Sequence, residues 1–118
     1  MEDYLEVIYE LIQRKGYATT VDISKYMSVS SPSVTKMVQR LDESGLVKYE
    51  KYRGIVLTNE GASIAVGIRD RHNLLVEFLK TIGVDETIAN SDAEGIEHHL
   101  HVQTLKKLEA FLASLKKR

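Results

Sequence analysis

The chain has 118 residues, an apolar fraction of 43% and a formal net charge of −1, which fit one small globular protein and argue against a general polycation. It contains no cysteine, so disulfide bonds and thiolate ligands are excluded, and any metal has to be held by oxygen and imidazole nitrogen. The acidic start Glu2-Asp3 does not fit a signal peptide, and no apolar run approaches the length of a membrane span. We therefore expect a cytoplasmic protein with no membrane partner.

Positive charge is concentrated in one segment. From Lys25 to Gly54 there are six basic and three acidic residues, whereas the remainder has ten basic and fourteen acidic residues. A locally positive region thus stands against a negative remainder, which the net charge alone conceals.

Residues from Glu2 to about Lys15 are predicted to form a helix, because Leu5, Ile8, Leu11 and Ile12 recur at helical spacing and Gly16 ends the run. Its polar side carries an acidic line of Asp3, Glu6 and Glu10. Like charges at this spacing repel, so a functional acidic face is one interpretation. A solvated face favoured by the helix dipole is the other.

Two short helices joined by a three-residue turn are predicted next, which is a helix-turn-helix. Thr19 and Thr20 begin a helix that runs to about Met27, residues 28–30 form the turn, and Ser31-Pro32 opens the second helix. In the second helix the predicted inward side chains are Val34, Met37, Val38 and Leu41. The candidate DNA contacts are Pro32, Ser33, Thr35, Lys36, Gln39 and Arg40. An ordinary amphipathic helix would show the same alternation of faces.

The segments 46–50 and 55–58 read as two strands joined by the turn Lys51-Tyr52-Arg53-Gly54. A basic hairpin that directly follows a helix-turn-helix is typical of a winged helix, whose wing touches the phosphate backbone. We therefore add Lys51 and Arg53 to the candidate DNA contacts.

The rest of the chain is predicted to be helical. A long helix runs from about Thr58 to about Ile82, with Gly83 as its stop and a buried stripe of Ile64, Ile68, Leu75, Phe78, Leu79 and Ile82. His72 falls on this stripe, either as a hydrogen-bonded core residue or as a ligand. A last helix over 102–116 spaces Leu105, Leu108, Leu112 and Leu115 as a packing seam, within the chain or with a second subunit. We favour a homodimer.

The predicted fold class is therefore mainly α. It combines an N-terminal winged helix-turn-helix domain in residues 1–60 with a C-terminal helical dimerisation domain in residues 61–118.

The stretch from Asp92 to His99 holds more potential metal donors than any other of its length. If it is helical, Glu94, Glu97 and His98 share one face. The alternative is that Ser91 to Glu94 form a capping box at a helix start, in which Glu94 bonds only to the backbone.

The ordered set of motifs resembles the diphtheria toxin repressor family of metal-activated repressors, over nearly the whole chain. The segments that carry the resemblance are Asp3-Tyr4-Leu5-Glu6, Ser31-Pro32-Ser33-Val34-Thr35-Lys36-Met37, Glu50-Lys51-Tyr52-Arg53-Gly54, Arg71-His72 and Glu94-Gly95-Ile96-Glu97-His98-His99. The resemblance implies two Mn(II) ions per subunit, bound by Asp3, Glu6, His72, Glu94, Glu97 and His98. Glu10, His99 and His101 match no ligand position. Co, Cd, Fe and Zn are expected to bind the same oxygen and nitrogen donors.

The function implied is that of a repressor in manganese homeostasis, which binds palindromic double-stranded operator DNA as a homodimer when metal is present. The resemblance implies no enzymatic activity. The main alternative is a metal-independent winged-helix regulator. A di-metal hydrolase and a purely structural winged helix are weaker alternatives, since the sequence offers a hydrolase no separate nucleophile or phosphate-binding loop.

Overall fold

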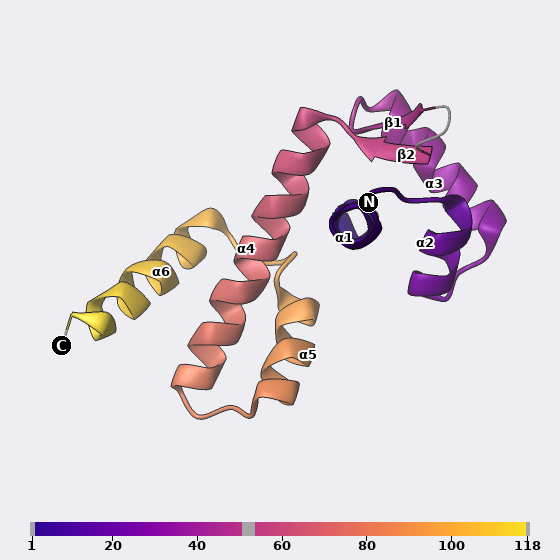
Figure 1. Cartoon of the computed structure of the whole chain (residues 1–118). Helices are drawn as coiled ribbons and strands as arrows, with labels where there is room; N and C mark the ends of the chain where they lie inside the picture. Colours follow the sequence, from indigo (N-terminus) through magenta and orange to yellow (C-terminus); the bar gives the residue numbers. More distant parts are fainter. Residues whose placement is uncertain (1, 51–53, 118) are drawn as a thin grey trace. The chain divides into compact units, whose positions relative to one another are not determined.

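The structure is a computed structural model that describes residues 2–50 and 54–117. In this part of the chain it consists of α1 (Glu2–Lys15), α2 (Thr20–Met27), α3 (Ser31–Glu43), β1 (Val47–Glu50), β2 (Gly54–Leu57), α4 (Asn59–Thr81), α5 (Glu86–Ile96) and α6 (Val102–Lys116) (Figure 1). The predicted class, mainly α with an N-terminal winged helix-turn-helix, is confirmed. Two candidate DNA contacts, Lys51 and Arg53, lie outside the described residues.

The chain forms two compact units, Met1–Gly67 and Ile68–Arg118, and α4 runs from the first into the second. Each unit has its own buried side chains.

The helices of the first unit begin and end where the sequence predicts. Gly16 follows α1 with a φ of 83°, a backbone conformation that glycine adopts at low cost. The Thr19 hydroxyl accepts a hydrogen bond from the backbone of Asp22 at 3.1 Å and so caps α2. The Ser30 hydroxyl caps α3 in the same way, and Pro32 lies in its first turn.

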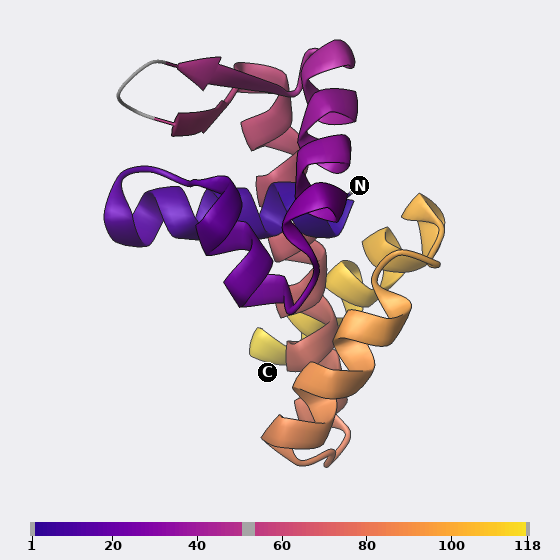
Figure 2. The same cartoon turned by 90° about the vertical axis from the view of Figure 1, so that its right-hand side faces the viewer.

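The core of the first unit forms where α1, α2 and α3 meet the hairpin. Its fully buried large side chains are Leu5, Ile8, Ile23, Val34, Leu41, Val47 and Ile55. Strands β1 and β2 pair antiparallel, with Val47 opposite Leu57 and Glu50 opposite Gly54. Ala18 continues the sheet on the other side of β2, because Ile55 donates to its carbonyl at 2.8 Å. Figure 2 shows the hairpin extending away from α3.

Thr58 joins the hairpin to the start of α4. Its hydroxyl donates to the carbonyl of Gly45 at 2.7 Å and accepts from the backbone of Gly61 at 3.1 Å. Gly61 lies so close to the carbonyl of Leu46 that a Cβ there would collide with it. The first turn of α4 is therefore held tightly against the segment that precedes β1.

In the second unit α5 lies beside the C-terminal half of α4 in both views (Figures 1 and 2). The buried side chains of the second unit include Ile68 and Leu75 on α4, Ala89 and Ala93 on α5, and Leu112 on α6. The rings of Phe78 on α4 and Phe111 on α6 meet edge to face, with centroids 6.2 Å apart.

One sequence-based expectation for this unit needs correction. Ile82 was placed in the buried stripe of α4 but is 60% exposed, because α4 ends at Thr81 and Ile82 lies beyond it. Of the four leucines in the seam of α6, Leu112 is buried and the other three are half-buried within this chain. The seam therefore packs partly inside the chain.

Candidate metal centre and nucleic-acid interface

Helix α3 presents a polar face to solvent. Pro32, Ser33, Thr35, Lys36, Gln39 and Arg40 are all exposed, whereas Val34 and Leu41 are fully buried and Met37 and Val38 are half-buried. The predicted division of the helix into an inner and an outer face is therefore correct.

The exposed side chains of α3 differ in how they are held. The Thr35 hydroxyl donates to the carbonyl of Ser31 at 3.0 Å, and the hydroxyls of Ser30 and Ser33 lie 2.8 Å apart. These short groups are held near the start of the helix. Lys36 and Arg40 lie one turn apart on the exposed side with Gln39 between them. This ridge offers long donors of the kind that bond to base edges or phosphates.

The second candidate region is the end of α5, where the structure differs from the sequence-based expectation. Helix α5 begins at Glu86 with Asp85 as its cap and ends at Ile96. Glu97 is its C-cap and keeps helical dihedral angles, with its N–H bonded to the carbonyl of Ala93 at 2.9 Å, so Glu94 and Glu97 still share a face. His98 lies in the turn that follows. The capping-box interpretation of Glu94 is wrong as well, because Glu94 lies in the last turns of α5 and not at its start.

Glu97 is the one buried charged side chain in residues 2–50 and 54–117, with 2% of its surface exposed. Its carboxylate lies between two imidazoles: Oε2 is 2.8 Å from Nδ1 of His72, and Oε1 is 3.4 Å from Nε2 of His98. Burial of a carboxylate is costly unless cations or hydrogen-bond donors face it. Three of the six predicted ligands are thus neighbours in the second unit.

The other predicted ligands are placed separately. Glu94 is exposed on α5, three residues before Glu97, whereas Asp3 and Glu6 lie on α1 in the first unit. Within the described residues, no three or more histidine and acidic side chains are arranged at metal-binding geometry.

The residues that do meet fit a divalent cation in their chemistry. Carboxylate and imidazole groups without sulfur are the donors that Mn(II) and similar ions accept. A cation beside Glu97 would also replace the hydration that this carboxylate has lost.

One residue that the sequence did not assign to a site, Asn90, takes part in these contacts. Asn90 Oδ1 lies 3.1 Å from Nε2 of His72, on the opposite side of the ring from Glu97. Asn90 precedes Glu97 by seven residues, two helical turns, and that spacing was the available signal. Glu10 matches no ligand, and its carboxylate bonds instead to Tyr26 and Arg14.

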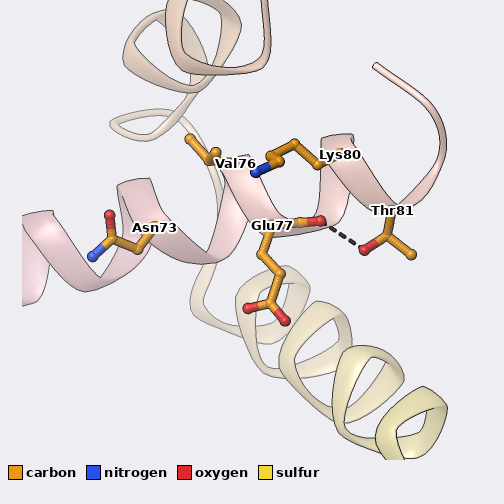
Figure 3. A pocket seen from close by; sticks show the side chains of 5 residues that line it. All are labelled: Asn73, Val76, Glu77, Lys80 and Thr81. Atoms are coloured by element: carbon orange, nitrogen blue, oxygen red, sulfur yellow. Dashed lines mark hydrogen bonds between the residues drawn. The ribbon is translucent and has the colours of Figure 1, made fainter. Parts of the chain in front are cut away.

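The surface of α4 also has a hollow of about 400 Å³, lined by Asn73, Val76, Glu77, Lys80 and Thr81 (Figure 3). None of these residues is a predicted ligand. The hydroxyl of Thr81 donates to the carbonyl of Glu77 in the same helix at 2.7 Å.

The fold and these contacts define a class of protein: a winged-helix DNA-binding regulator with a helical unit that offers carboxylate and imidazole ligands. Among the described residues, no helix is long and apolar enough to cross a membrane.

Comparison with known proteins supports this class. Residues 1–55 match the family described as iron dependent repressor, N-terminal DNA binding domain, and residues 58–118 match iron dependent repressor, metal binding and dimerisation domain. The chain therefore belongs to the iron dependent repressor family, and the resemblance to metal-activated repressors is confirmed. This is a family of transcriptional repressors and not of enzymes.

Individual relatives agree with the family. The chain is 51% identical to the HTH-type transcriptional regulator MntR of Bacillus velezensis over 108 residues, which cover 92% of this chain and 76% of that protein. It also resembles the structure of the manganese regulator SloR at 33% identity and a TM-score of 0.82, over 95% of this chain and 53% of that one. The crystal structure of ScaR with bound Zn²⁺ is similar at 30% identity and a TM-score of 0.82, again over 95% and 53% of the two chains. The chain thus spans about half the length of these solved relatives.

Proposed function

We propose that this chain represses transcription in manganese homeostasis. It binds palindromic operator DNA as a homodimer when Mn(II) occupies a binuclear site, two ions per subunit. The family assignment and the 51% identity to MntR support the repressor function, and the manganese regulator SloR supports the choice of metal.

The main support for the proposed metal site is the Glu97 carboxylate, which is buried between the imidazoles of His72 and His98. A buried acid faced by two imidazole nitrogens has a composition suited to a cation. The other proposed ligands are Glu94 on α5 and Asp3 and Glu6 on α1.

The charges of the six proposed ligands favour the binding of two ions. Four carboxylates and two neutral imidazoles carry a formal charge of −4, which two divalent cations balance. When bound, the metal supplies this positive charge and holds ligands from different helices together. Without it, the carboxylates of Asp3, Glu6 and Glu94 repel Glu97 wherever they approach it.

On this proposal, bound metal strengthens DNA binding because it restricts the motion of the chain. Asp3 and Glu6 belong to the unit that contains the helix-turn-helix, and the other four ligands belong to the unit that contains α5 and α6. Two recognition helices of a dimer have to meet major grooves about 34 Å apart. A dimer whose recognition helices sample many separations binds DNA in proportion to the fraction of dimers with the right separation. Metal ligands that restrict the chain raise this fraction and with it the affinity for DNA.

The DNA-binding surface is proposed to be the exposed ridge of Lys36, Gln39 and Arg40, with Pro32, Ser33 and Thr35 at the start of α3. The basic wing residues Lys51 and Arg53 are proposed to bind phosphates. These charges make the affinity for DNA fall as salt concentration rises.

The test is an operator titration with Mn(II) and with a chelator, on the wild type and on Glu6→Ala and His98→Ala. We expect Mn(II) to strengthen operator binding by the wild type, and both variants to lose this effect while they remain folded dimers. His99→Ala is the matched control, since His99 is an exposed neighbour that matches no ligand.

Two results would reject parts of the proposal. Equal operator binding with Mn(II) and with chelator would favour the main alternative, a metal-independent regulator. Retained stimulation in Glu6→Ala or His98→Ala would reject the ligand assignment.

A further inference from the structure

The hydrogen bonds around His72 determine which of its ring nitrogens faces Glu97. The ring lies between two side chains of the α5 segment: its Nδ1 is 2.8 Å from Glu97 Oε2, and its Nε2 is 3.1 Å from Asn90 Oδ1. All of these residues belong to the second unit.

The orientation of the Asn90 amide is fixed by a separate contact. Its Nδ2 donates to the carbonyl of Glu86, one turn earlier in α5, at 2.9 Å. The amide nitrogen therefore points back along the helix, and the amide oxygen is the atom left to face His72. A carbonyl oxygen only accepts, so Nε2 of His72 has to carry the proton in this contact.

We propose that Asn90 is a positioning residue of the metal centre: it holds the Nε2–H of His72 and thereby reserves Nδ1 for the metal. A neutral imidazole has one protonated nitrogen and one with a free lone pair, and only the second binds a metal. With the Nε2–H donated to Asn90, Nδ1 is the nitrogen left for the metal. In the metal-free chain Nδ1 shares a proton with the Glu97 carboxylate at 2.8 Å, and this is the proton that metal binding releases.

The amide acts on the metal through His72 and is not itself a ligand. A histidine ligand usually donates its second ring N–H to an acceptor that fixes the ring orientation and raises its basicity. The Asn90 amide is exposed, and its bond to Glu86 is what gives it a fixed direction. The inference rests on the proposed function for the metal, whereas the position of the proton is independent of it.

The experiment compares Asn90→Leu, which removes the acceptor, with Asn90→Asp, which keeps one on either carboxylate oxygen. Ser91→Ala is the control for an exposed substitution on the same helix. Asn90→Ala repeats the loss of the acceptor with a smaller side chain, in case the leucine variant does not fold. The first readout is the ¹⁵N shift of His72 Nε2 in the metal-free full chain.

We expect a protonated Nε2 in the wild type and in Asn90→Asp, and a loss of this preference in Asn90→Leu. The second readout is Mn(II) affinity by calorimetry, which we expect to fall about tenfold in Asn90→Leu and Asn90→Ala. It should stay close to the wild type in Asn90→Asp and Ser91→Ala. Thermal midpoints of the metal-free variants should match the wild type, because a purely structural role would change these instead.

An unprotonated Nε2 in the wild type would overturn the inference whatever the metal does. Wild-type Mn(II) affinity in Asn90→Leu, or an equal loss in Asn90→Asp, would overturn it as well. Failure of the proposed function would look different: Mn(II) would not alter operator binding by the wild type, and the Nε2 proton would still be found.

Discussion

The phenolic oxygen of Tyr26 on α2 lies 2.6 Å from Oε2 of Glu10 on α1, and the other oxygen of Glu10 accepts from Arg14 at 2.7 Å. The bond to Glu10 raises the pKa of Tyr26, because it stabilises the protonated phenol. A second link, from Lys15 to Asp22 at 2.9 Å, joins the same two helices. The helix that carries Asp3 and Glu6 is thus bonded through side chains to the first helix of the helix-turn-helix.

Tyr26→Phe should lower the free energy of unfolding by about 0.5–1 kcal/mol, since it removes one partly exposed hydrogen bond to a charged group. Urea denaturation measures this, with Tyr49→Phe as the control on an exposed tyrosine of β1. In a double-mutant cycle with Glu10→Gln the two effects should not add. Additive losses would show that Tyr26 and Glu10 act separately.

The Asp22 carboxyl predicts a pH dependence. The hydrogen bond from Lys15 is the main cause that lowers the pKa of Asp22, with a smaller contribution from the Thr19 hydroxyl. A carboxylate whose pKa is lower in the folded chain stabilises the fold above its ordinary range near about 4, and loses this contribution as the pH falls through the folded pKa.

Asp22→Asn should therefore lower the free energy of unfolding at neutral pH, by no more than about 1 kcal/mol because the ion pair is partly exposed. The deficit should disappear in acid. Thermal unfolding of both proteins across this range is the measurement. An equal deficit at neutral and acid pH would assign the effect to packing and not to charge.

Ser28 adopts a left-handed conformation at the turn of the helix-turn-helix, with a φ of 56°. Glycine reaches this conformation at lower cost, so Ser28→Gly should raise the free energy of unfolding by about 0.5–1 kcal/mol. Ser44→Gly is the matched control, because Ser44 ends α3 at a φ of −82° and glycine there only adds freedom to the unfolded chain. If both substitutions destabilise equally, the strain at Ser28 is absent.

Gly61→Ala should destabilise the chain by about 2 kcal/mol or more, because its Cβ would overlap the carbonyl oxygen of Leu46. Gly67→Ala on the same helix is the control. A Cβ there meets nothing within 4 Å, so alanine should stabilise α4 by about 0.5–1 kcal/mol. Chemical denaturation of the two variants should give shifts of opposite sign, and shifts of the same sign would contradict the close contact at Gly61.

Zinc should bind the proposed site and activate DNA binding poorly. Zn(II) binds oxygen and nitrogen donors more tightly than Mn(II) in the usual order, and it prefers four ligands in a tetrahedron. It would therefore occupy the site without engaging all six ligands. Operator affinity at saturating Zn(II) and at saturating Mn(II) is the comparison, and equal affinities would reject this view of selectivity.

The sequence by itself determined the local structure and the class. Apolar periodicity, Pro32 and the stops at Gly16 and Gly83 placed the helices to within a residue or two, since these signals act over one or two turns. The order of the motifs along the chain was sufficient to indicate the family. The sequence predicts a helix that continues through Glu97 and His98, whereas α5 ends at Ile96. The nearest glycine, Gly95, lies inside the last turn and not just past the helix end, where a glycine stop is usual, so it does not mark this end.

Only the tertiary structure decided which side chains meet. The sequence separates His72 from Glu97 by 25 positions, and no local pattern says that a buried carboxylate lies between His72 and His98 or that Asn90 bonds to the other side of the ring. Those contacts depend on how α5 packs against α4. Packing of this kind is set by many small apolar contacts, such as those of Ala89 and Ala93, that carry no motif of their own.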